Sequence, residues 1–218
     1  DTDRSRGLGD VYKRQVVGGA KVSSKIGVLE NLLDKVDNMI IGGGMAYTFV
    51  KANGGKIGNS ICEDDQIETA KAIEKKAAEK GVKLVMATDV LVTDDFSGNG
   101  TNKFVKINEI PDGFEGVDAG PDSRKAFADV LKSSKTILMN GPVGAFENPK
   151  FAEGTKAVLE AIVEATKAGA TSVIGGGDSV SAAKKFFKAE DFTHVSTGGG
   201  ASLEFIEGKV LPGVAALD

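Results

Sequence analysis

The sequence contains few of the residues on which several kinds of functional site depend. Its 218 residues include one cysteine, Cys62, which excludes an internal disulfide and a cysteine-cluster metal site. The single histidine, His194, lies next to a predicted strand, and a hydrogen-bonded structural role is a better interpretation of it than catalysis. With one histidine and no G-x-S-x-G segment, the chain has no Ser/His/Asp set for nucleophilic catalysis.

Long apolar runs and strong net charge are also missing. No run approaches the roughly 20 apolar residues of a membrane span, so we expect no membrane partner. The net charge of -4 argues against nucleic acid as a partner, because binding to a phosphate backbone needs clustered lysine and arginine. The near absence of cysteine fits a reducing compartment, and we expect a cytoplasmic monomer.

Glycine is the residue that the chain has in excess. There are 29 glycines against only 5 prolines, and the glycines cluster in short groups that follow apolar runs. Short apolar runs, as at 38–41, 82–87, 136–139, 171–174 and 194–196, alternate with segments of helical spacing, as at 45–52, 67–80, 122–131, 180–187 and 201–207. This alternation predicts an α/β fold with a doubly wound, mostly parallel sheet, a Rossmann-like three-layer αβα arrangement, and a small antiparallel excursion over 90–107.

The strongest local signal for ligand binding is Gly175–Ser179, GGGDS, between a predicted strand and a predicted helix. Glycines let the backbone approach an anion, and the N–H groups at a helix start attract phosphate. Asp178 offers the hard oxygen ligand that a phosphate-bound Mg²⁺ prefers. A helix cap formed by Asp178 or Ser179 explains the motif equally well.

Two more glycine triplets follow predicted strands. Gly198–Gly200 repeats the phosphate-binding pattern, although a tight turn for helix packing explains it equally well. Gly42–Gly44 is followed by Met45, Ala46 and Tyr47 and has no polar side chain beside it. Packing, or close approach to a flat ring, is the better interpretation of that turn.

Charged residues near these turns are further candidates. Lys21 and Lys25 are four residues apart at the predicted start of a helix, where cations are disfavoured unless an anion lies between them. Two solvated surface lysines remain the alternative. Glu147 follows the turn that starts at Asn140, and it is either a ligand for ribose hydroxyls or an acidic residue in a helix-start turn.

The standard nucleotide motifs are not present. The chain has neither G-x-G-x-x-G nor G-x-x-x-x-G-K-[ST], which argues against a dinucleotide-binding oxidoreductase and against a P-loop protein. An unrelated α/β oxidoreductase that binds NAD is therefore the weakest of the functions considered.

Four stretches combine these turns with their neighbouring strands and helices. They are GGAKVSSKIGVLENLLDKVDNMIIGGGMAYTF (Gly18–Phe49), NGPVGAFE (Asn140–Glu147), IGGGDS (Ile174–Ser179) and HVSTGGGASLEFIEGKVLPGVAAL (His194–Leu217). From about Val16 onward, their order and spacing resemble the C-terminal, nucleotide-binding domain of the phosphoglycerate kinase family.

This resemblance implies reversible phosphoryl transfer between 1,3-bisphosphoglycerate and MgADP, giving 3-phosphoglycerate and MgATP, in glycolysis. It implies that Lys21 stabilises the moving phosphoryl group and that Gly198 and Gly199 present N–H groups at the transfer point. Lys25 would contact the nucleotide phosphates, and Asp178 would hold Mg²⁺. The other implied residues are Gly43, Gly44, Gly116, Val117 and Pro142 around the adenine, Glu147 at the ribose, and Asn140, Gly176, Gly177 and Ser179 near the phosphates.

Three residues depart from the family pattern. Ser24 stands where the family usually has aspartate in the K-V-x-D-K run, which puts the orientation of Lys25 in question. Ser179 replaces a frequent threonine but keeps the hydroxyl. Met139 stands where the family often has tryptophan, an exchange of large apolar side chains.

The resemblance also divides the chain. Residues 1–15 match nothing in the family, and we interpret them as a non-native leader because DVYKRQ (residues 10–15) looks like translated adapter sequence. Residues 16–218 would be the nucleotide-binding domain, and the family's N-terminal domain for 3-phosphoglycerate would be absent. Two hypotheses follow: the chain represents an active phosphoglycerate kinase, or it is a module that binds MgADP or MgATP without turnover.

Overall fold

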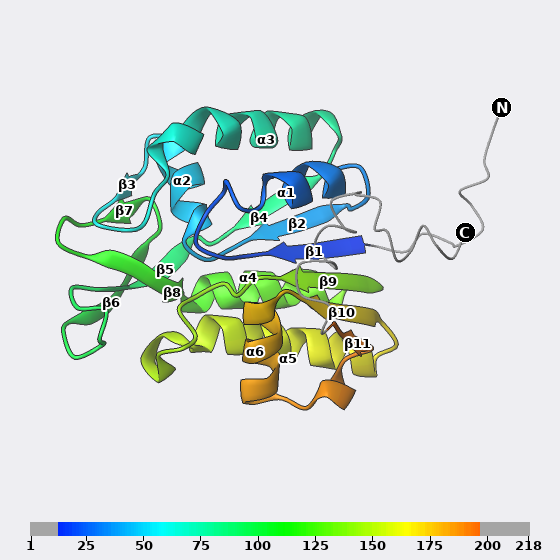
Figure 1. Ribbon diagram of the computed structural model, residues 1–218. Helices are drawn as coiled ribbons and strands as arrows, with labels where there is room; N and C mark the ends of the chain where they lie inside the picture. The colour runs from blue at the N-terminus through cyan, green and yellow to red at the C-terminus, as the bar shows by residue number, and fades with distance from the viewer. Residues whose placement is uncertain (1–12, 197–218) are drawn as a thin grey trace.

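A computed structural model describes residues 13–196, in which strands and helices alternate (Figure 1). The strands are β1 (Lys13–Val17), β2 (Asn38–Ile41), β3 (Lys56–Ile57), β4 (Lys83–Met86), β5 (Asp89–Thr93), β6 (Asn102–Lys106), β7 (Glu109–Ile110), β8 (Glu115–Ala119), β9 (Thr136–Asn140), β10 (Thr171–Gly175) and β11 (His194–Val195). The helices are α1 (Ile26–Leu32), α2 (Met45–Ala52), α3 (Ile67–Glu79), α4 (Pro121–Lys132), α5 (Glu153–Lys167) and α6 (Gly177–Phe186), with short 3₁₀ segments η1 (Asp64–Gln66), η2 (Pro149–Phe151) and η3 (Ala189–Asp191).

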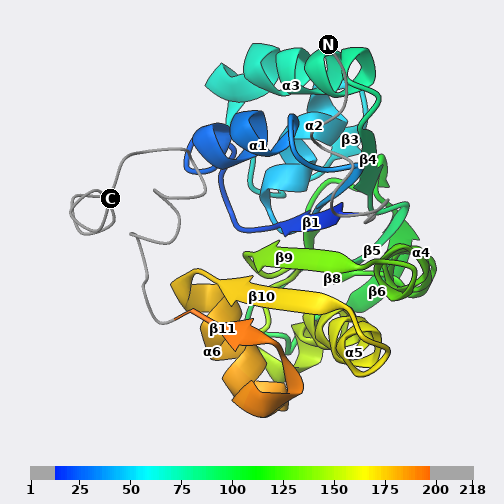
Figure 2. The ribbon, with the colours of Figure 1, turned by 90° about the vertical axis from the view of Figure 1, so that its right-hand side faces the viewer.

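Six strands form the central sheet in the order β11-β10-β9-β1-β2-β4. Every neighbouring pair is parallel, and the sheet extends from β1 in both directions. Figures 1 and 2 show α1–α3 gathered at the β2–β4 end and α5 and α6 at the β10–β11 end. The predicted doubly wound, mostly parallel α/β fold is therefore confirmed.

Successive side chains of each strand point to opposite faces of the sheet, and the apolar ones form a hydrophobic core on each face. On one face, Val17 and Ile41 pack with buried residues of α1, α2 and α3. On the other, Val16, Ile40 and Met139 pack with α4, α5 and α6. With both faces covered, the carboxyl ends of the strands are where such a sheet offers a ligand site.

Two smaller sheets lie beside the central one. Strands β6, β5 and β8 form an antiparallel sheet, as predicted for the excursion over 90–107, and β3 pairs with β7. Strand β8 was not predicted from the sequence, because Gly116 and Asp118 interrupt its apolar pattern. This strand brings residues 115–117 back toward the central sheet.

Strand β1 combines a polar amino-terminal half with an apolar carboxyl-terminal half. It lies between β2 and β9, with Arg14 opposite Asn38 and Ile137. Gln15 is completely buried, so the strand accommodates polar residues where a doubly covered sheet usually has apolar ones. Within residues 13–196, none of the helices is both long enough and apolar enough to span a bilayer.

Two predicted helix starts differ from the structure. Helix α1 begins only at Ile26, because Ser23–Lys25 form a turn, so Lys21 and Lys25 do not share a helix face as expected. Helix α6 begins at Gly177 rather than Val180, because Gly176 takes a φ of 86° and turns the chain directly from β10 into the helix.

Candidate functional site

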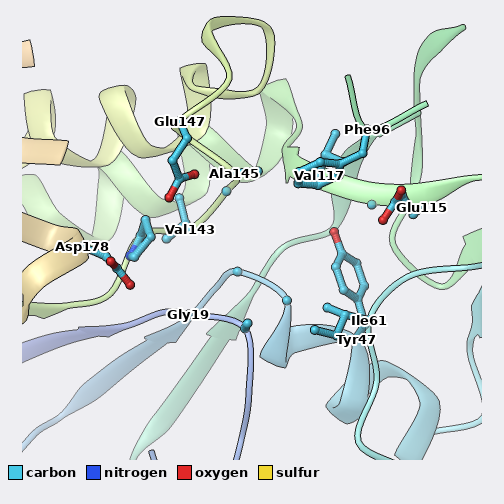
Figure 3. A pocket seen from close by; sticks show the side chains of 16 residues that line it. Gly19, Tyr47, Ile61, Phe96, Glu115, Val117, Val143, Ala145, Glu147 and Asp178 are labelled. Carbon is cyan, nitrogen blue, oxygen red and sulfur yellow. The ribbon is translucent and has the colours of Figure 1, made fainter. Parts of the chain in front are cut away.

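Two neighbouring cavities lie at the carboxyl ends of the central strands. The larger cavity has a volume of about 320 Å³ (Figure 3). The residues that line it are Gly19, Ala20, Gly43, Gly44, Tyr47, Ile61, Phe96, Glu115, Gly116, Val117, Pro142, Val143, Gly144, Ala145, Glu147 and Asp178. The smaller cavity, of about 170 Å³, is lined by Lys25, Asn140, Gly141, Gly176, Gly177, Asp178 and Ser179. Asp178 lines both, so the two cavities adjoin.

The floor of the larger cavity is made by turns that bond to one another. The Gly19 N–H donates to the Pro142 carbonyl oxygen at 3.2 Å, and the Gly43 N–H donates to that of Val143 at 3.2 Å. Gly43 has a φ of 71°, and a Cβ there would lie 2.7 Å from the Gly19 oxygen and 3.0 Å from the Pro142 oxygen. Close backbone packing therefore requires glycine at position 43.

The opposite wall comes from the antiparallel sheet and from α2. A Cβ on Gly116 would collide with the Tyr47 hydroxyl, and the Gly116 N–H donates to Ser60 Oγ at 2.8 Å. Figure 3 shows the Tyr47 hydroxyl pointing toward Glu115 and Val117. Burial, and to a lesser degree the carboxylates of Asp118 and Glu115, raise the pKa of Tyr47, which therefore stays protonated.

The smaller cavity has polar walls. Lys25 Nζ donates to Asn140 Oδ1 at 2.7 Å, and the Gly141 N–H donates to Ser179 Oγ at 2.6 Å. Asn140 is completely buried, and its Nδ2 donates to no described residue. Gly177 and Asp178 are exposed in the first turn of α6. A cation, an unused amide donor and a helix N-terminus thus converge on one small space, a combination that suits an anion.

The other candidate residues from the sequence are exposed or lie outside the described residues. Lys21 is exposed and lines neither cavity, and its carbonyl oxygen accepts a hydrogen bond from Ser24 Oγ at 2.8 Å. Glu147 is exposed just before η2, and Figure 3 shows its carboxylate directed into the larger cavity. Gly198 and Gly199 lie outside the described residues. His194 is exposed on β11 and its imidazole makes no hydrogen bond with the described part of the chain.

Several lining residues were not predicted from the sequence. Tyr47, Ile61, Phe96 and Glu115 reach the larger cavity from four separate segments. The exposure of Ile61 and Phe96, 43% and 55%, is unusual for large apolar side chains. For Tyr47 the available signal is its position three residues after the Gly42–Gly44 turn, which places it in the first turn of the following helix.

Asp118 is a buried carboxyl group behind the larger cavity. Its Oδ2 accepts a hydrogen bond from the Gly154 N–H at 2.7 Å, whereas its Oδ1 has no hydrogen-bond donor among the described residues. Burial raises the pKa of Asp118 to about 7, although the Gly154 and Ala119 N–H groups act in the opposite direction. Asp118 ties the start of α5 to β8 and does not line either of the two neighbouring cavities.

The fold and the position of the cavities define a Rossmann-like α/β domain with its ligand site at the carboxyl edge of a parallel sheet. The family model described as "Phosphoglycerate kinase" matches residues 12–209. A phosphoglycerate kinase from Gloeothece citriformis (strain PCC 7424) is 56% identical over 203 residues, which are 93% of this chain and 51% of the relative. The chain belongs to the phosphoglycerate kinase family, a family of kinases.

Solved structures agree with this assignment. Phosphoglycerate kinase from Coxiella burnetii matches with a TM-score of 0.91 and 43% identity, over 98% of this chain and 55% of that one. Phosphoglycerate Kinase from Pyrococcus horikoshii OT3 matches with a TM-score of 0.79 and 29% identity, over 98% and 53%. The chain thus spans about half the length of the relatives that it matches.

Proposed function

We propose that the two adjoining cavities bind MgADP or MgATP, with the base in the larger cavity and the phosphates in the smaller one. One observation carries this proposal. All twelve nucleotide-site residues that the family resemblance implies, from Lys25 to Ser179, line one cavity or the other. Their positions in the sequence are up to 154 residues apart (179 − 25), so only the fold brings them together.

In the larger cavity, the adenine would lie between the glycine turn at Gly43 and Gly44 and the strand residues Gly116 and Val117. Glycine at these positions lets the backbone pack closely against Gly19, Pro142 and Tyr47, so that the turn and the strand form two side-chain-poor walls between which a flat ring fits. Pro142 would border the same ring, and the Glu147 carboxylate would accept hydrogen bonds from the ribose hydroxyls.

In the smaller cavity, the phosphates would meet the Lys25 ammonium and the N–H groups at the start of α6. Gly176 and Gly177 let the phosphate chain approach the backbone, and Ser179 holds the turn through its bond from Gly141. The Asn140 Nδ2, which donates to no described residue, offers a further donor. A phosphate would therefore satisfy a group that is buried without an acceptor.

The residues present fit a phosphate-bound Mg²⁺. Asp178 places one carboxylate where the cavities adjoin, and the described residues contain no group of three or more acidic, histidine or cysteine side chains that would hold a metal ion alone. Mg²⁺ commonly binds through one or two carboxylates together with substrate phosphates and water. When bound, the ion would neutralise phosphate charge, and Asp178 would hold it.

For a protein of the relatives' full length, we propose transfer of a phosphoryl group between 1,3-bisphosphoglycerate and MgADP, as a step of glycolysis in the cytoplasm. Such transfer depends mainly on positioning and on electrostatic stabilisation of an in-line transition state. Lys21, exposed beside the cavities, would stabilise the moving group together with N–H groups of Gly198 and Gly199. The other substrate, 1,3-bisphosphoglycerate or 3-phosphoglycerate, would be brought from a second domain by hinge closure.

Calorimetric titration with MgADP tests the nucleotide site. Asp178→Ala and Lys25→Ala should each weaken binding by about tenfold or more, because each removes a charged partner of the phosphates. Asp112→Ala and Lys35→Ala, at exposed positions away from both cavities, should bind as the unchanged chain does. Unchanged affinity in both Asp178→Ala and Lys25→Ala would remove the assignment, and tighter binding of NAD than of ADP would favour an oxidoreductase.

A coupled assay separates the two roles of the chain. We propose that these 218 residues alone bind nucleotide without turnover, a proposal supported by their match to about half of each relative. The assay should show no ATP formation from 1,3-bisphosphoglycerate. Measurable turnover by the chain alone would contradict the binding-only proposal and leave the nucleotide site standing.

A further inference from the structure

A lysine on α6 holds the loop that carries Glu147. Lys185 Nζ donates to the Phe146 carbonyl oxygen at 2.8 Å and to the Glu147 carbonyl oxygen at 3.2 Å. The same ammonium lies 5.8 Å from the ring centroid of Phe146 and 5.5 Å from that of Phe186. One cation therefore bridges two consecutive carbonyl groups of the loop and lies near two aromatic rings.

Hydrogen bonds hold the loop on both sides of Glu147. The Ala145 N–H donates to the Val117 carbonyl oxygen at 2.8 Å, and the Phe146 N–H donates to that of Gly144 at 2.9 Å. These bonds restrain the chain before Glu147, whose own side chain is exposed. After Glu147, the Asn148 N–H donates to the Ala145 carbonyl oxygen at 3.1 Å, and Asn148 Nδ2 donates to the Phe96 and Ser97 carbonyl oxygens at 3.4 and 3.2 Å. Among the described hydrogen bonds, the one from Lys185 is the bond that restrains the carbonyl of Glu147 itself, so it holds the backbone from which the carboxylate extends.

Helix α6 connects this contact to the smaller cavity. The helix begins at Gly177, next to Asp178 in the phosphate turn, and Lys185 lies in its last turn. Eight residues at about 1.5 Å each separate Gly177 from Lys185, a span of roughly 12 Å. Because a short helix is rigid, the position of the phosphate turn and the position of Glu147 are set relative to each other.

We infer that Lys185 is a positioning residue that holds Glu147 at the distance from the phosphate turn which a nucleoside diphosphate requires. This inference rests on the proposed function, in which Glu147 accepts hydrogen bonds from the ribose hydroxyls. Lys185 touches no part of the ligand, because it lines neither cavity. Its loss would therefore weaken recognition of the ribose while leaving the phosphate contacts in place.

The test compares the affinities for MgADP and for Mg-2′,3′-dideoxy-ADP, measured by calorimetry on the full chain. The unchanged chain should prefer ADP by about tenfold, the usual effect of hydrogen bonds to a charged acceptor. Lys185→Met should reduce this preference to about twofold or less, while its affinity for the dideoxy nucleotide stays within about twofold. Lys185→Arg, which keeps a cation and its donors, should retain most of the preference.

Lys184 supplies the matched control. It is exposed beside Lys185 on α6 and makes no hydrogen bond or ion pair with another described residue, so Lys184→Met should keep the full preference for ADP. If Lys185→Met does not fold, Lys185→Gln, which is shorter and uncharged, replaces it in the comparison. In a Glu147→Gln background, Lys185→Met should change the preference no further.

The outcomes distinguish the two proposals. If the unchanged chain binds no MgADP, the proposed function fails. If it binds MgADP and Lys185→Met keeps the same preference for the ribose hydroxyls, the positioning role fails and the nucleotide site stands. Equal affinity of the unchanged chain for both nucleotides would also overturn the positioning role, because Glu147 would then have no ribose to recognise.

Discussion

Buried polar groups are hydrogen-bonded differently beside the carboxyl end of strand β1 and within the strand itself. At the carboxyl end, the Lys25 ammonium is bonded to Asn140, and Ser179 accepts the Gly141 N–H. In the middle of β1, Gln15 is completely buried. Its Nε2 donates to the Val16 carbonyl oxygen at 3.1 Å, but its Oε1 accepts no hydrogen bond from a described residue. The polar groups beside the carboxyl end of β1 are thus largely paired with one another, whereas the strand itself contains a buried amide oxygen without a donor among the described residues.

The difference lies in what surrounds each group. The Asn140 Nδ2 also lacks a described partner, but Asn140 lines the smaller cavity, where a ligand can supply an acceptor. Gln15 lines neither of the two neighbouring cavities and has packed strands on both sides. An unpaired group beside a cavity points to a ligand, whereas one inside packed structure costs stability.

The largest effect on the free energy of unfolding is expected at Asp118, whose buried carboxyl group is incompletely hydrogen-bonded. Its pKa is raised by burial from 3.8 to about 7, so the folded chain binds this proton more tightly than the unfolded chain. The resulting stability is fully present below about pH 4 and is lost as the pH rises through about 7. The loss should reach about 4 kcal/mol, since one pKa unit corresponds to about 1.4 kcal/mol.

Urea unfolding at a series of pH values, compared between the unchanged chain and Asp118→Asn, isolates this contribution from those of other acids. The stability difference between the two should change steadily from about pH 4 to about pH 7 and be level above that range. Asp112→Asn, at an exposed turn, should show no such dependence. Parallel stability curves for the unchanged chain and Asp118→Asn would show that Asp118 titrates normally.

A somewhat smaller effect is expected at the carboxyl end of β2. Gly43→Ala should cost about 2–4 kcal/mol, because the new Cβ meets backbone atoms of Gly19 and Pro142 and the residue keeps a φ of 71°. Gly54→Ala is the matched control, since Gly54 has a φ of 79° with nothing within 4 Å of an added Cβ. Gly54→Ala should lower the free energy of unfolding by about 1 kcal/mol, because only the left-handed conformation of the residue opposes it. Equal urea midpoints for both variants would contradict the close-packed floor.

Much of the fold could be predicted because its signals are local. Strand β2 and helix α2 have the predicted bounds, since an apolar run, a glycine triplet and a helical repeat follow one another directly. The glycine turns were assigned to the carboxyl edge of the sheet because parallel strands place their ends together. These inferences needed only neighbouring residues and the rule that strands and helices alternate.

The parts that could not be predicted depend on contacts between distant segments. Phe96 and Glu115 reach the larger cavity because the antiparallel sheet folds back, which no local pattern of theirs indicates. The spacing of Lys21 and Lys25 suggested one helix face, but a turn over 23–25 delays the helix. Burial raises the pKa of Asp118, and its one side-chain hydrogen bond from α5, donated by Gly154 36 residues further along the chain, acts in the opposite direction.

The smallest effects on the free energy of unfolding should have opposite signs at Gln15, within β1, and at Ser179, beside its carboxyl end. Gln15→Leu should stabilise the chain by about 1 kcal/mol, because it removes a buried amide oxygen that has no donor among the described residues and adds apolar contact. Ser179→Ala should destabilise it by about 1–2 kcal/mol, because the buried Gly141 N–H loses its acceptor. Urea unfolding measures both changes, and leaving nucleotide out separates stability from ligand binding. Destabilisation by Gln15→Leu would mean that the Gln15 amide oxygen has a hydrogen-bond donor. The buried polar groups within β1 and beside its carboxyl end would then all be paired.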